Sequence, residues 1–85
     1  MKSFTFKIRD DVGIHARPAG MLVKLAKETA SQVTLKKGDK MADATKLFSV
    51  MALGVKCGDT VEICVEGGDE DNSIQALKSF FEDNL

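Results

Sequence analysis

Alternation of hydrophobic and polar side chains along the chain predicts four strands. A two-residue period runs through residues 4–9, 32–36 and 60–66, and a shorter segment at 41–43 follows a predicted hairpin turn, Lys37-Gly38-Asp39-Lys40. A period of two places alternate side chains on opposite faces of a sheet, so each strand would bury one face. The side chains expected on the buried face are Phe4, Phe6, Ile8, Val33, Leu35, Val61, Ile63 and Val65.

Three other segments have features typical of helices. After Pro18 the hydrophobic residues recur at i, i+3, i+4 and i+7, and proline is tolerated only in a first turn, so this helix should begin near His15 or Ala16. Residues 47–53 form a short apolar segment, and the acidic stretch 69–71 suits the start of a last helix. The expected core side chains are Ala19, Leu22, Val23, Ala26, Val50, Leu53, Ile74, Leu77 and Phe81.

The resulting order, β-α-β-β-α-β-α, predicts an α+β fold. Strands with one apolar face leave the other face in solvent, so all helices should cover the same side and give a two-layer open-faced sandwich. The chain has 85 residues, which is enough for one small core, and we expect a single domain spanning residues 1–85.

Composition narrows the classes of function. A formal net charge of −1 argues against nucleic acid as the main partner. Cys57 and Cys64 form no Cys-x-x-Cys and have no histidine nearby, which argues against a metal or redox site, although a disulfide between them stays open. The N-terminus has no apolar signal segment, and no apolar run approaches the ~20 residues that cross a bilayer. We therefore expect a cytoplasmic protein with reduced thiols, no cofactor and no membrane insertion.

The candidate site surrounds the only histidine, in the motif Gly13-Ile14-His15-Ala16-Arg17-Pro18-Ala19. A helix N-terminus presents free backbone N–H groups and a partial positive charge, so a phosphate on His15 would meet donors from Ala16 and Arg17. The Arg17 guanidinium can also engage phosphate oxygens. The positive helix end disfavours the imidazolium and leaves the neutral, nucleophilic ring. From geometry alone, a helix cap or an ordinary surface histidine remains an alternative.

No general acid or base flanks His15 in the sequence. Asp10 and Asp11 are the nearest acids upstream, and we expect them to be solvated loop residues. A nucleophile without hydrolytic machinery suits a phosphate carrier better than a hydrolase.

The histidine motif, together with Leu47-Phe48-Ser49-Val50-Met51-Ala52-Leu53-Gly54, resembles the HPr family of the sugar phosphotransferase system over essentially the whole chain. The resemblance implies a four-stranded antiparallel sheet in the order 1-4-2-3 with three helices on one face. It implies that His15 accepts a phosphoryl group on Nδ1 from enzyme I and donates it to enzyme IIA components, with help from Arg17. Such a protein is a stoichiometric carrier and not a turnover enzyme, and we expect a monomer.

The resemblance also implies a docking surface beside His15. Its members would come from the first helix and the short helix, namely Gly20, Met21, Lys24, Lys27, Lys46, Leu47, Phe48 and Met51. An exposed apolar centre ringed by lysines suits brief contact with acidic partners. Without the resemblance, Lys24 and Lys27 would be read as a solvated helix face and Phe48 as a core residue.

One position departs from the family pattern. Many HPr proteins of Gram-positive bacteria carry a regulatory serine where this chain has Lys46, so that serine is absent. Thr45 or Ser49 could replace it, but a helix cap and a surface hydroxyl are the simpler interpretations. Lys46 adds positive charge where a phosphoserine would add negative charge.

Three alternatives stay open. A nitrogen-regulatory member of the same family would use the same histidine chemistry and differ in its partners. A small acid-anhydride hydrolase would bind phosphate through Arg17 and release it free, whereas a carrier would form a stable, acid-labile phosphoprotein. A regulatory binding module without chemistry is the third alternative, although such homologues lack the histidine that is present here.

Overall fold

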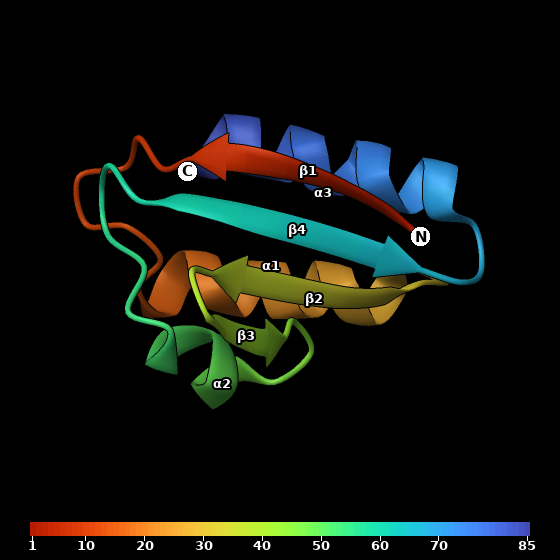
Figure 1. Cartoon of the computed structure of the whole chain (residues 1–85), viewed down its shortest axis with the longest axis horizontal. Coiled ribbons are helices and arrows are strands. Elements are labelled where there is room, and N and C mark those ends of the chain that lie inside the picture. The colour runs from red at the N-terminus through yellow and green to blue at the C-terminus, as the bar shows by residue number, and fades with distance from the viewer.

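The computed structural model describes all residues from Met1 to Leu85, and its strands form one antiparallel sheet. The four strands are β1 (Lys2–Lys7), β2 (Gln32–Lys37), β3 (Lys40–Asp43) and β4 (Thr60–Glu66). Their order across the sheet is β1-β4-β2-β3, so the first and last strands of the chain lie side by side (Figure 1). The predicted strand order and the antiparallel pairing are confirmed.

Three helices complete the fold and confirm the α+β architecture. They are α1 (Ala16–Glu28), α2 (Leu47–Ala52) and α3 (Glu70–Asn84). In Figure 1, α1 and α3 lie behind the sheet, and the short α2 lies at the lower edge beside β3. Helix α2 contacts both α1 and β3. One face of the sheet is therefore covered, and the other is open.

The core lies between the sheet and the two long helices. The register brings Ile63 of β4 opposite Phe4 of β1 and Leu35 of β2, so the apolar side chains of neighbouring strands share the covered face. Phe81 of α3 is fully buried and packs edge-to-face on Phe4 and Phe6, with ring centroids 5.9 and 5.5 Å apart. Phe4 and Phe6 are only partly buried, because β1 is an edge strand.

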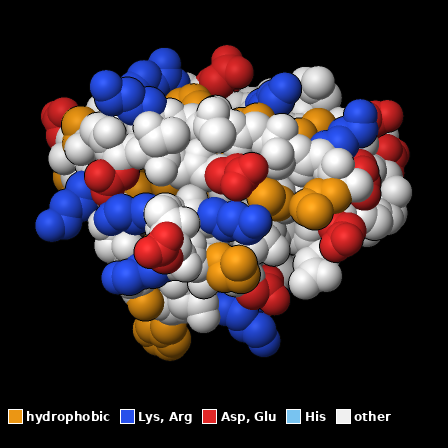
Figure 2. Space-filling view, viewed as in Figure 1, with side chains coloured by type: hydrophobic (Ala, Val, Ile, Leu, Met, Phe, Trp, Pro, Cys, Tyr) orange, Lys and Arg blue, Asp and Glu red, His pale blue; other side chains and the backbone are white.

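The open face of the sheet is polar. Figure 2 shows scattered basic and acidic side chains over this face, with hydrophobic side chains protruding below it over α2. Cys64 lies on this side, between Ser3 and Thr34 of the adjacent strands, but its neighbours bury it. That burial raises the pKa of the Cys64 thiol. Cys57 is exposed, and both thiols are free. None of the helices combines the length and apolar composition needed to cross a membrane.

A network of polar contacts around Asp59 joins the connection between α2 and β4 to the rest of the sheet. One carboxylate oxygen of Asp59 accepts a 2.8 Å hydrogen bond from the Lys56 N–H and lies 3.0 Å from the Lys37 ammonium. The Lys37 ammonium also donates to the Gly54 carbonyl at 2.9 Å. The hydrogen bond from Lys56 and the charge of Lys37 lower the pKa of the Asp59 carboxyl.

The lowered pKa of Asp59 predicts that this residue contributes to the loss of folding stability at acidic pH. A carboxyl whose pKa is lower in the folded than in the unfolded chain stabilises the fold above about pH 3.9, and the benefit is lost as the pH falls through its folded pKa. Asp59→Asn should therefore give a shallower loss of stability between neutral and acidic pH, measured by urea unfolding. Asp39→Asn, which removes an exposed carboxylate without an ion pair, is the control. Identical pH profiles for Asp59→Asn and the unsubstituted chain would contradict this account.

Candidate functional site

His15 stands immediately before α1, as the pattern around Pro18 predicts. It is the N-cap residue, with an extended backbone (φ −99°, ψ −171°), and its carbonyl accepts a 2.9 Å hydrogen bond from the Ala19 N–H. Its side chain makes no capping hydrogen bond and is partly exposed. The imidazole is therefore not used to cap the helix, and it remains accessible.

The first turn of α1 keeps its hydrogen-bond donors free. Neither the Ala16 N–H nor the Arg17 N–H has a partner, and Pro18 has no N–H to contribute. The first turn also contains no acidic residue that would neutralise the positive end of this 13-residue helix. Two amide donors and the helix dipole thus remain available to an anion held at His15.

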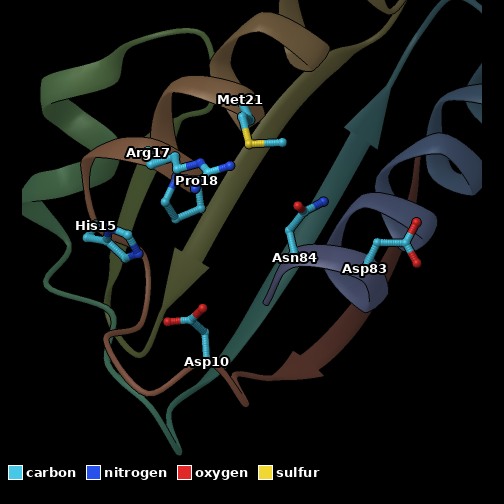
Figure 3. Close-up of a pocket in the computed structure, with 7 residues that line it drawn as sticks. All are labelled: Asp10, His15, Arg17, Pro18, Met21, Asp83 and Asn84. Carbon is cyan, nitrogen blue, oxygen red and sulfur yellow. The ribbon is translucent and has the colours of Figure 1, made fainter.

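A depression of about 280 Å³ lies beside His15. It is lined by Asp10, His15, Arg17, Pro18, Met21, Asp83 and Asn84 (Figure 3). These residues come from the loop after β1, the first turns of α1 and the last turn of α3. In Figure 3 the Asp10 carboxylate is directed toward the space beside His15, whereas the Asp83 carboxylate points away from it.

Arg17 is the only cation that lines this depression. Its guanidinium is exposed and forms neither an ion pair nor a hydrogen bond, so it is free to turn toward an anion. The structure thus brings the four predicted groups of the site together: the His15 ring, the Arg17 guanidinium and the amides of Ala16 and Arg17. Asp10, Asp83 and Asn84 join them, and the sequence analysis had not assigned them to the site.

Backbone contacts hold the loop that carries His15. The Ile14 N–H donates to the Val55 carbonyl at 3.1 Å, and the Asp10 N–H donates to the Leu85 carbonyl at 2.8 Å. Gly13 has a φ of 78° and lies so close to the connection between α2 and β4 that an added Cβ would be 2.3 Å from the Val55 oxygen. Only glycine fits there, because the space and the backbone conformation both exclude a side chain.

The residues predicted to form the docking surface lie on two neighbouring helices. On α1, Lys24 and Lys27 are exposed and Met21 is 43% exposed. On α2, Phe48 is 83% and Met51 is 37% exposed. The interpretation of Phe48 as a core residue is therefore wrong.

The remaining members of that set differ in exposure. Lys46 is exposed, Gly20 is half-buried, and Leu47 is half-buried against the core. Val12, in the loop before His15, is 64% exposed and adds an apolar side chain that the sequence analysis did not select.

Thr45 does not cap α2. The N-cap residue is Lys46, and no side chain caps this helix. The Thr45 hydroxyl and N–H instead donate to one carboxylate oxygen of Asp43, at 2.7 and 2.9 Å. These hydrogen bonds lower the pKa of the Asp43 carboxyl. Ser49 is exposed, as expected for a surface hydroxyl.

Comparison with known proteins identifies the family. The sequence model described as the PTS HPr component phosphorylation site matches residues 2–83. The chain belongs to the HPr family. HPr proteins are phosphocarriers of the phosphotransferase system, and two named relatives agree. The phosphocarrier protein HPr of Mycoplasma capricolum is 38% identical over 92% of this chain and 88% of its own length. That of Lysinibacillus sphaericus is 40% identical over 91% of this chain and 88% of its own.

Solved HPr structures share the fold. A histidine-containing phosphocarrier protein of Mycoplasma superposes with a TM-score of 0.92 at 36% identity. The superposition covers 96% of this chain and 93% of that one. HPr from Thermoanaerobacter tengcongensis gives a TM-score of 0.91 at 38% identity, with 96% and 92% covered. A dimeric HPr from the same organism gives a TM-score of 0.76 at 37% identity, covering 98% of this chain and 95% of that one.

The close approach at Gly13 predicts that its replacement disturbs the candidate site around His15. Gly13→Ala should lower the free energy of unfolding by about 1–3 kcal/mol more than Gly54→Ala, because both positions have positive φ but only Gly13 lacks space for a Cβ. Urea unfolding measures the difference, and NMR spectra should show the His15 ring resonances moving in Gly13→Ala alone. Equal destabilisation with unchanged His15 resonances in both variants would contradict the role of this contact.

Proposed function

We propose that this HPr chain carries a phosphoryl group on His15, taken from phospho-enzyme I and passed to enzyme IIA components for coupled sugar uptake. The observation that carries the proposal is an accessible imidazole before two partnerless helix N–H groups, with the free Arg17 guanidinium in the same depression. We further propose that residues 1–85 act as one HPr domain and as a monomer.

The transfer replaces the bond between phosphorus and the donor group of enzyme I with a phosphorus–nitrogen bond to His15. The unprotonated Nδ1 of the neutral His15 ring attacks phosphorus as the bond between phosphorus and the donor group of enzyme I breaks, and the family resemblance supports this choice of nitrogen. The Ala16 and Arg17 amides and the Arg17 guanidinium then face the phosphoryl oxygens. Charge-assisted hydrogen bonds of this kind stabilise an anion more strongly than neutral ones do.

Several features of the surface support transient docking beside His15. Phe48 and Met51 on α2 and Met21 on α1 are exposed apolar side chains. The basic residues that accompany them are Lys24 and Lys27 on α1 and Lys46, the N-cap residue of α2. A small apolar centre gives contact area, while surrounding lysines attract an acidic partner and accelerate encounter. Lys46 extends this positive charge to the start of α2, where the regulatory serine of many relatives is absent.

Phosphoryl acceptance at His15 can be tested directly. The chain should form a phosphoprotein when incubated with enzyme I and phosphoenolpyruvate, and the phosphate should be lost in acid but not in alkali. His15→Ala should abolish acceptance while circular dichroism and urea unfolding show an intact fold. An acid-labile phosphate on the alanine variant would contradict the assignment. Rapid release of free phosphate by the unsubstituted chain would instead support the hydrolase alternative.

The branch of the phosphotransferase system is decided by the acceptor. Transfer from the phosphorylated chain to sugar-specific enzyme IIA proteins supports the sugar branch. Transfer confined to nitrogen-regulatory acceptors supports the alternative member of the family.

The proposed docking surface leads to a second testable prediction. Lys24→Glu combined with Lys27→Glu should slow phosphoryl transfer from enzyme I at least tenfold at low salt, because the charge that attracts the partner is reversed. Stopped-flow or quench-flow transfer assays measure the rate. The control pair, Lys7→Glu with Lys40→Glu, makes the same charge change on exposed residues of β1 and β3. Equal rates for the two double variants would contradict this docking surface.

A further inference from the structure

Asp10 occupies an unusual electrostatic position beside His15. Asp10 lies in the loop after β1. Its carboxylate is directed toward the depression that His15 and Arg17 also line (Figure 3). No lysine, arginine or histidine pairs with it. An unpaired carboxylate therefore faces the place where a carried phosphoryl group would lie.

The position of this carboxylate is fixed by the loop. One oxygen of Asp10 accepts a 2.9 Å hydrogen bond from the Val12 N–H, and the Asp10 carbonyl accepts a 3.0 Å bond from the Gly13 N–H. The Asp10 N–H donates to the Leu85 carbonyl at 2.8 Å, which ties the loop to the end of α3. The second carboxylate oxygen has no hydrogen-bond partner. The loop thus holds a negative charge at a defined place.

Charge balance in the depression changes when His15 is loaded. In the unloaded protein the depression is lined by charges of both signs, with the Arg17 guanidinium and the Asp10 carboxylate on its walls. A phosphoryl group adds about two negative charges. Arg17 and the helix amides attract this group, whereas Asp10 repels it. Asp83 also lines the depression, but its carboxylate points away, so Asp10 is the main source of repulsion.

We propose that Asp10 tunes the phosphoryl-transfer equilibrium by destabilising the loaded form of His15. This inference rests on the proposed function and adds a specific role for a residue outside the histidine motif. Repulsion from a fixed carboxylate weakens the hold of the site on the phosphoryl group, so the group leaves more readily to an acceptor. The helix end and Arg17 supply the opposing attraction, and the balance between them sets how readily the carrier is loaded and unloaded.

The equilibrium between phospho-enzyme I and this chain tests the inference. The bond between phosphorus and the donor group of enzyme I breaks while the bond to His15 forms, without water or a further reactant. The equilibrium ratio of phosphorylated chain to phosphorylated enzyme I does not depend on how fast the proteins dock. Mixing defined amounts of phospho-enzyme I and the chain, without phosphoenolpyruvate, and quantifying both phosphoproteins on phosphate-affinity gels gives this ratio.

Asp10→Asn and Asp11→Asn form a matched pair. Both substitutions remove one negative charge from the same loop, but only Asp10 lines the depression. An asparagine at position 10 keeps an oxygen to accept the Val12 N–H, so the loop should be retained. Asp10→Asn should shift the equilibrium toward the phosphorylated chain by about threefold to tenfold, and Asp11→Asn by less than about twofold. The difference between them should shrink at ~1 M salt.

Three results would overturn the inference, and those that contradict the role of Asp10 alone are distinguishable from the one that also contradicts the proposed function. Equal equilibrium ratios for Asp10→Asn and Asp11→Asn, or a shift of Asp10→Asn toward the unphosphorylated chain, would contradict the role of Asp10 alone. Failure of the unsubstituted chain to accept phosphate on His15 would contradict the proposed function and the inference together.

Discussion

The geometry of the site depends on how the loop between β1 and α1 is held. Gly13 lies against the backbone of Val55 and Lys56, and Ile14 donates its N–H to the Val55 carbonyl. These contacts fix the direction in which the chain enters α1, so His15 takes the extended backbone of an N-cap residue. The two amides that follow are then left without partners at the positive end of the helix. A shift of this loop would alter the imidazole, the amides and the guanidinium together.

The open-faced sandwich explains why such a site can be accessible in a small protein. The core between the sheet and the two long helices stabilises the fold, and the ends of the helices extend to its margin. The first turn of α1 and the last turn of α3 meet at this margin, beside the loop after β1. The proposed site therefore lies at the margin of the core, where a partner can reach it. The exposed apolar side chains of α1 and α2 lie on the adjoining helical surface.

Much of the fold followed from local patterns. Two-residue alternation predicted the bounds of β4 correctly. Pro18 placed the start of α1 near His15 or Ala16, and the helix begins at Ala16. The packing of neighbours was harder to predict. Cys64 alternates as an outward-facing residue and yet is buried, in a central strand between Ser3 of β1 and Thr34 of β2. No local pattern carries that information.

The sequence predicted the residues of the histidine motif, but it did not predict the residues that the rest of the fold brings beside them. His15, Arg17 and the helix amides are adjacent in the sequence, so their proximity could be inferred. Asp83 and Asn84 come from the other end of the chain and reach the depression through the fold, where Asp10 is tied to Leu85 by a backbone hydrogen bond. Asp10 and Asp11 look alike in the sequence, and only the conformation of the loop distinguishes them.

The central claim is that the free amides at the start of α1 hold the phosphoryl group of His15. Proton–nitrogen NMR spectra of the chain before and after phosphorylation test it most directly, because an amide that donates to a phosphoryl oxygen shifts strongly downfield. We expect the largest downfield proton shifts at Ala16 and Arg17, with small changes in the remaining turns of α1. Phosphorylation of His15 that leaves both amide resonances in place would contradict it.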